Sequence, residues 1–125
     1  MYLRKFVTKD NYTRAYITAI NGPLQLTPRE IDVFSVLMKI DMAWRPKMVS
    51  DLKNLLSTDN RRLIMKEANI SKANLTRAVK KFISVGIIEY TLDGRYIIPE
   101  MIRPIINDNK INIHFIIDFN KPIEN

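Results

Sequence analysis

The segment from residue 60 to residue 98 constrains the fold of this chain more than any other. It contains two helical patterns, at 60–68 and 72–85, separated by the turn residues Asn69-Ile70-Ser71. A run of β-branched and aromatic residues follows at 87–98, with Asp-Gly inside it, which is typical of a two-residue hairpin turn. A helix, a turn, a longer helix and a hairpin in this order can hold one helix against duplex DNA.

The helix predicted over 72–85 has a signal at each end and two unlike faces. The Ser71 hydroxyl can cap its first turn, and Gly86 suits the left-handed position just past its last turn. At about 100° per residue, its apolar side consists of Leu75, Ala78, Val79, Phe82 and Ile83. The opposite side is small, polar and basic, and consists of Ala73, Asn74, Thr76, Arg77, Lys80, Lys81 and Ser84. Such a face suits a major groove, although the same face on an isolated helix is more often only solvated.

The elements on either side of this helix supply three further candidate contacts. The helix predicted over 60–68 is expected to bury Leu63, Ile64, Met65 and Ala68. Arg61 and Arg62 stand at its start, where basic charge interacts unfavourably with the helix dipole. A DNA phosphate bound at that end would offset this cost. An ordinary surface position explains these two arginines equally well. Arg95 flanks the hairpin turn and is the candidate for a contact with a phosphate or with the minor groove.

The segment 70–89 resembles the recognition helix and wing of winged helix-turn-helix proteins, such as MarR-type regulators and the winged-helix replication initiators of plasmids. The likeness continues through Gly94-Arg-Tyr-Ile-Ile-Pro99 and reaches back to Leu26-Thr-Pro-Arg-Glu-Ile31, so that it covers about 26–103. The resemblance implies a winged-helix fold with these groove-facing positions: Lys72, Asn74, Thr76, Arg77 and Lys80. Since the superfamily also contains domains that bind only protein, it implies the fold more strongly than the function.

The positive charge of the chain is concentrated in the same region. The net charge is +7, and the segment 45–81 holds ten Lys/Arg and three Asp/Glu, a local charge of +7. Residues 1–44 carry six basic and four acidic side chains, and residues 82–125 carry four and six. A basic block that coincides with a helix-turn-helix pattern favours double-stranded DNA as the partner.

A helix predicted over 28–40 begins with a capping box, in which Thr27 is the cap, Pro28 the first helical residue and Glu30 the returning acid. It is apolar almost all round, so it belongs either in the core, which we favour, or in an oligomer interface. A further helix is predicted over 46–56, with these residues inward: Val49, Leu52, Leu55 and Leu56.

Both ends of the chain have strand-like patterns. Residues 2–8 and 12–20 are predicted to form a hairpin that turns at 9–11. Near the other end, 111–119 is predicted as a strand with this apolar face: Ile111, Ile113, Phe115, Ile117 and Phe119. We therefore expect an accessory sheet formed by both termini, whose apolar face needs a cover from the N-terminal hairpin or another subunit.

Together these patterns predict an α+β fold in one domain, a winged helix-turn-helix with an accessory β-sheet. The N-terminal β extension covers 1–25, the winged helix-turn-helix covers 26–103, and the C-terminal strand extension covers 104–125. A chain of 125 residues has room for one modest core.

Signatures of catalysis and of cofactor binding are nearly absent from the sequence. It has no Cys, one His (His114) and three Gly, and these form neither metal-ligand spacing nor a phosphate-binding loop. We expect no enzyme and no cofactor. No apolar run has transmembrane length and no signal peptide is evident, so we expect a cytoplasmic location.

Two hypotheses of function follow. The first is a DNA-binding protein of bacterial, plasmid or phage origin that regulates transcription or DNA replication through a major-groove helix. The second is a structural or adaptor protein, for example a component of a phage particle, that assembles with other subunits through the helix at 28–40 and the terminal strands. Abundant Ile, Lys and Asn indicate an AT-rich genome, such as that of a low-GC bacterium or its phage.

Overall fold

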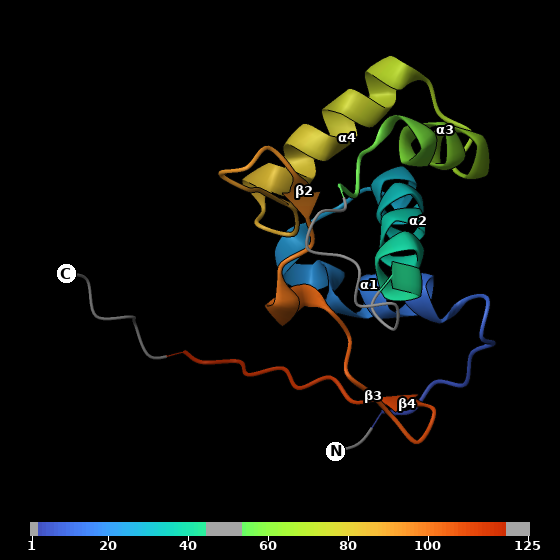
Figure 1. The fold of residues 1–125 in the computed structure, drawn as a ribbon. Helices are drawn as coiled ribbons and strands as arrows, with labels where there is room; N and C mark the ends of the chain where they lie inside the picture. Colours follow the sequence, from blue (N-terminus) through green and yellow to red (C-terminus); the bar gives the residue numbers. More distant parts are fainter. Residues whose placement is uncertain (1–2, 45–53, 120–125) are drawn as a thin grey trace.

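The computed structural model describes residues 3–44 and 54–119, which form α-helices and two small antiparallel sheets (Figure 1). The fold class is therefore α+β. The helices are α1 (Tyr12–Leu24), α2 (Pro28–Trp44), α3 (Thr58–Glu67) and α4 (Lys72–Ser84). The strands are β1 (Glu89–Tyr90), β2 (Tyr96–Ile97), β3 (Ile106–Asn107) and β4 (Lys110–Ile111), with a 3-10 helix at Glu100–Ile102.

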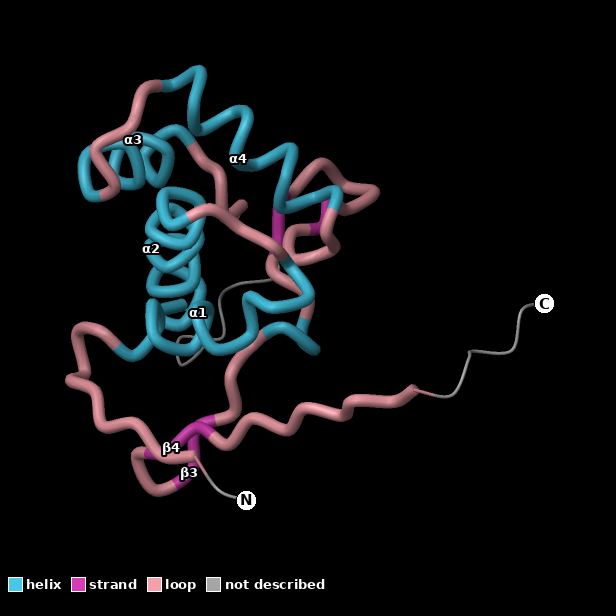
Figure 2. The backbone as a smooth tube through the Cα atoms, turned by 180° about the vertical axis from the view of Figure 1, so that it is seen from behind, coloured by secondary structure: helices cyan, strands magenta, loops and turns pink. Residues whose placement is uncertain are grey.

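Helix α2 is the centre of the fold and lies between α1 and the pair α3 and α4 (Figure 2). The predicted capping box forms in both directions: the Thr27 N–H donates to the Glu30 carboxylate (2.8 Å), and the Glu30 N–H donates to the Thr27 hydroxyl (3.2 Å). The helix continues past residue 40 as far as Trp44. Its buried apolar residues surround the axis: Ile31, Val33, Phe34, Leu37, Met38 and Ile40. The prediction of a core position is confirmed.

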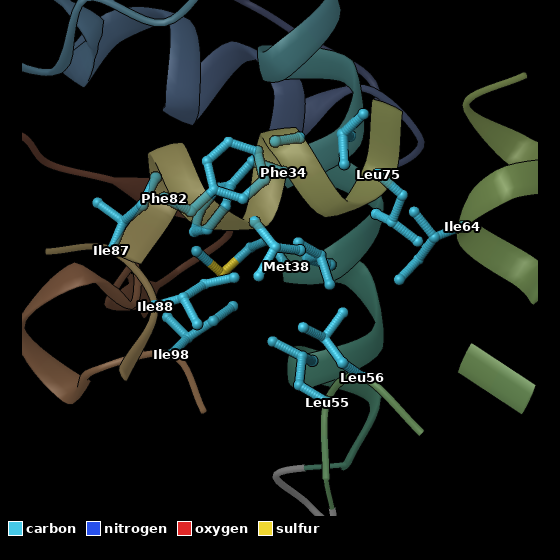
Figure 3. Packing of buried hydrophobic residues seen from close by; sticks show 14 of the residues in the cluster. Phe34, Met38, Leu55, Leu56, Ile64, Leu75, Phe82, Ile87, Ile88 and Ile98 are labelled. Atoms are coloured by element: carbon cyan, nitrogen blue, oxygen red, sulfur yellow. The ribbon is translucent and has the colours of Figure 1, made fainter. Parts of the chain in front are cut away.

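One apolar cluster joins α2 to α3, α4 and the first hairpin (Figure 3). Phe34 of α2 and Phe82 of α4 meet edge to face, with ring centroids 5.1 Å apart. Ile64 is the fully buried residue of α3. The remaining members near this centre come from α2, α4 and the hairpin flanks: Met38, Leu75, Ile87, Ile88 and Ile98. This packing fixes how α4 is rotated about its own axis.

Helices α3 and α4 are joined by a short turn. Asn69 adopts a left-handed conformation (φ 51°), and Ile70 is buried beside it. The Ser71 hydroxyl accepts from the Asn74 N–H (3.2 Å), and Gly86 takes a positive φ of 84° beyond the end of α4. Both predicted end signals are confirmed. The helix predicted over 60–68 begins slightly earlier, at Thr58, with the Ser57 hydroxyl as its cap.

The hairpin after α4 pairs Glu89 with Ile97 and Tyr90 with Tyr96. Its turn differs from the predicted two-residue Asp-Gly type. The Thr91 N–H donates to the Arg95 carbonyl (2.7 Å), so residues 92–94 form a three-residue loop. Gly94, at φ 86°, takes the left-handed position that closes such a loop. The prediction of a hairpin is confirmed, and the prediction of its turn type is wrong.

Most of the helix predicted over 46–56, including Val49 and Leu52, lies at 46–53, outside the described residues. Its described end is not helical. Instead, the Leu55 N–H donates to the Tyr96 carbonyl (3.0 Å), and the Asn54 side chain accepts from the Tyr96 N–H (2.9 Å). Leu55 and Leu56 are buried as predicted, but they reach the core from a chain segment that lies along β2.

Helix α1 overturns the predicted N-terminal hairpin. Residues 12–20 are rich in Tyr, Thr and Ile, which favour strands, yet they belong to a helix, and residues 3–8 contain no strand. Thr13 and Ile17, four residues apart, are fully buried on one helix face. Packing of that face against α2 overrides the local preference for β structure.

The predicted strand over 111–119 is also wrong beyond Ile111. β4 ends there and pairs with β3, so that Ile106 lies opposite Ile111. Residues 112–119 have no regular secondary structure and extend away from the helices (Figure 1). Within the described part of the chain, no N-terminal strand joins β3 and β4, so the accessory sheet from both termini is not formed. The reason is that a strand pattern needs a neighbour to accept its hydrogen bonds.

Candidate nucleic-acid interface

The outer face of α4, which comprises Lys72, Asn74, Thr76, Arg77 and Lys80, is exposed in every member. The opposite side is buried through Leu75, Ala78, Val79 and Phe82, so this helix presents its basic side to the surroundings. Lys81 is half-buried at the margin of the face. Ile83 was expected inward but is 41% exposed, because it lies about 100° round the helix from Phe82, at the edge of the apolar side.

Two side chains of the outer face hold each other in place. The Arg77 guanidinium donates to the Asn74 side-chain oxygen (2.8 Å) from one turn further along α4. The Thr76 hydroxyl donates to the Lys72 carbonyl (3.0 Å). Arg77 therefore has an oriented guanidinium group, with a neutral oxygen as its partner.

The two arginines at the start of α3 differ in their surroundings. Arg61 is half-buried, and its Nε donates to the Leu56 carbonyl (2.8 Å), so it holds the preceding segment against the helix. Arg62 is exposed. Leu63, which was expected to be buried, is 42% exposed, whereas Ile64 is fully buried as predicted. In the first turn of α3, Arg62 is therefore available to a phosphate as it stands. Arg61 would first have to release the Leu56 carbonyl.

Arg95, the candidate from the hairpin, is paired within its own loop. Its Nε lies 2.8 Å from a carboxylate oxygen of Asp93. The Thr91 hydroxyl, followed by Arg95, lowers the pKa of Asp93 below its ordinary value. Asp93 is therefore ionised near neutral pH, where it offsets the charge that Arg95 would bring to a phosphate.

The arginines of residues 3–44 and 54–119 that make side-chain bonds fall into two groups. Three lie beside carboxylates, in the pairs Arg14–Asp32, Arg95–Asp93 and Arg103–Asp41. Three donate to neutral oxygens: Arg29, Arg61 and Arg77. The second group lies at the start of α2, at the start of α3 and on α4. Of these six arginines, the three whose charge no bonded carboxylate offsets therefore belong to α2, α3 and α4.

Arg29 is the member of this group that the sequence did not indicate. It stands in the capping box of α2, and its guanidinium donates to the Asn69 carbonyl in the turn between α3 and α4. No local pattern relates two residues that are 40 positions apart. Only the packing of the start of α2 against that turn brings Arg29 beside the outer face of α4.

Comparisons of this chain with protein-family models, with curated proteins and with solved structures found no match. An assignment of function therefore rests on the geometry described above and on the sequence patterns. Among the described residues, no helix combines the length and the apolar character that are needed to cross a membrane. Within the same residues, no cluster of three or more His, Asp or Glu side chains could hold a metal ion.

Proposed function

We propose that this chain is a winged helix-turn-helix protein that binds double-stranded DNA with the outer face of α4 in a major groove. The observation that carries the proposal is the division of α4 into a buried apolar side and an exposed basic side that has no acidic residue. In this proposal α3 is the supporting helix, and the hairpin formed by β1 and β2 is the wing. A basic face of this kind is suited to phosphates along its margins and to base edges at its centre.

The proposed contacts follow from the chemistry of each side chain. Arg77 and Asn74 can make bidentate hydrogen bonds, Arg to guanine and Asn to adenine, and they lie together on α4. The remaining members of the interface are assigned to phosphates and backbone: Lys72, Thr76, Lys80, Lys81, Arg61 and Arg62. Arg95 contributes least, because a phosphate has to compete with Asp93 for its guanidinium group.

The same proposal places the protein in the cytoplasm of a bacterium or a phage-infected cell, where it regulates transcription or replication. Support for this role comes from the sequence likeness to winged-helix regulators and plasmid initiators over about 26–103. DNA binding and sequence reading are separate parts of the proposal, since winged-helix domains serve several functions.

Binding to a pool of random duplexes at several salt concentrations tests both parts. If about five cations meet phosphates, the logarithm of the binding constant should fall against the logarithm of salt with a slope of roughly −4 to −5. Sequencing of the bound duplexes should reveal an enriched site. A slope near zero contradicts DNA binding, and a steep slope without enrichment contradicts sequence reading.

One observation favours a second candidate, a structural or adaptor protein that assembles through its C-terminal arm. Large apolar side chains of the arm, residues 105–119, are exposed, with Ile116 at 89%, Ile117 at 91% and Phe119 at 93%. Apolar side chains in this number are typical of an assembly surface. Sedimentation velocity separates the candidates: an assembly protein forms a stable high-order species, and a monomer at all concentrations contradicts this candidate.

A further inference from the structure

A shallow pocket of about 230 Å³ lies between the start of α2 and the first half of α4. Its lining residues are Arg29, Glu30, Val33, Ile70, Asn74, Arg77 and Ala78. Val33, Ile70 and Ala78 supply apolar surface, while two guanidinium groups and an amide supply hydrogen-bond donors. The pocket thus combines donors from two helices beside the turn that precedes α4.

The charge of this pocket suits a single anion. Arg29 and Arg77 are positive, and Glu30 is the acidic residue among the lining side chains. The Glu30 carboxylate already accepts from the Thr27 N–H in the capping box (2.8 Å). Both arginines bond neutral oxygens, those of Asn69 and Asn74, so neither is neutralised by a carboxylate. Each guanidinium group has five N–H donors, and these bonds leave several of them for a ligand.

We propose that a backbone phosphodiester of the bound duplex occupies the mouth of this pocket, between Arg29 and one pair of Arg77 N–H donors. Arg77 gives one of its five donors to Asn74, so a second pair remains for the base edge assigned to it above. The inference rests on the proposed DNA binding and extends the interface from α3 and α4 to the start of α2. Arginine is suited to this role because its planar donors match phosphate oxygens in pairs. A phosphate held from two helices fixes the register of α4 along the groove, whereas base contacts decide the sequence.

Arg29 distinguishes this inference from the wider proposal, because it belongs to α2 and is not one of the outer-face residues of α4. Arg29→Gln removes one cation from the pocket, and should shift the salt slope of duplex binding by about +0.9 and weaken binding about fivefold at 0.15 M salt. The enriched DNA sequence should stay the same. Arg29→Lys keeps the charge and should keep the wild-type slope.

Arg14→Gln is the matched control, because Arg14 is exposed on α1 and is neutralised by Asp32 at 2.7 Å. Its slope should equal that of the wild type. The phosphate site alone is overturned if the salt slope of Arg29→Gln equals that of the wild type. It is also overturned if Arg14→Gln or Arg29→Lys changes the slope and the affinity as much as Arg29→Gln does. If the wild-type protein does not bind duplex DNA, the proposed function and this inference both fall.

Discussion

Replacing both Arg77 and Lys80 by alanine is expected to weaken binding of the protein to its preferred duplex by about 20-fold or more at 0.15 M salt. Loss of the Arg77 base contact should cost roughly 1–3 kcal/mol, and loss of a Lys80 phosphate contact about a further fivefold in affinity. The variant should also discriminate less among DNA sequences, because Arg77 is the proposed base-reading residue. Fluorescence anisotropy with the enriched duplex and a scrambled duplex measures both effects.

The control for this variant removes the same charge from another part of the surface. Arg14→Ala combined with Lys39→Ala also replaces one Arg and one Lys, and both residues are exposed on α1 and α2. Its affinity should change much less, since these positions lie outside the proposed interface. Unchanged binding by the Arg77 and Lys80 variant contradicts the major-groove assignment of α4, whatever the control shows.

Phe82→Ala is expected to produce the largest loss of stability, about 3–5 kcal/mol in the free energy of unfolding. Phe82 is fully buried, and its ring meets that of Phe34 at 5.1 Å, in the cluster that joins α4 to α2. Removal of the ring leaves a cavity at the contact that orients α4. Urea denaturation followed by circular dichroism measures the change through the midpoint of unfolding.

Ile83→Ala on the same helix is the matched control for Phe82→Ala. Because Ile83 is 41% exposed, its truncation should cost about 1 kcal/mol or less, from burial of only part of its apolar surface. Comparable losses for Phe82 and Ile83 contradict the observed rotation of α4, and with it the identity of the residues on its outer face.

The elements that were predicted correctly have local signals that agree with their packing. Helix α2 has a complete capping box, so its start follows from nearby residues, although its end at Trp44 lies beyond the predicted residue 40. Helix α4 has the Ser71 cap and Gly86, so both of its ends follow from nearby residues. Helix α1 was missed because its Tyr, Ile and Thr residues favour strands, while its burial of Ile17 depends on α2. The prediction of a strand at 111–119 was wrong for a related reason. Alternating apolar residues indicate which side chains would share a face, but a strand also requires a neighbouring strand with which to form hydrogen bonds.

In the candidate site, too, some features could be predicted from the sequence and others could not. Periodicity alone predicts that Arg77 and Lys80 lie opposite the buried side of α4, and the structure places them there. The bonds of Arg61 to the Leu56 carbonyl and of Arg95 to Asp93 are local, five and two positions apart in the sequence. They depend on the conformations of the turn before α3 and of the hairpin loop, which the sequence patterns did not specify. The approach of Arg29 to the turn before α4 likewise depends on how α2 packs.

Whether α4 binds DNA can be seen directly by mapping the amide groups whose NMR signals shift when a duplex is added to the labelled protein. The largest shifts are expected at 58–62 and 71–81, at the start of α3 and along α4. Residues 105–119 should shift little. Shifts concentrated in the C-terminal arm, or no shifts at all under low-salt conditions, would contradict the claim that α4 is the DNA-binding surface.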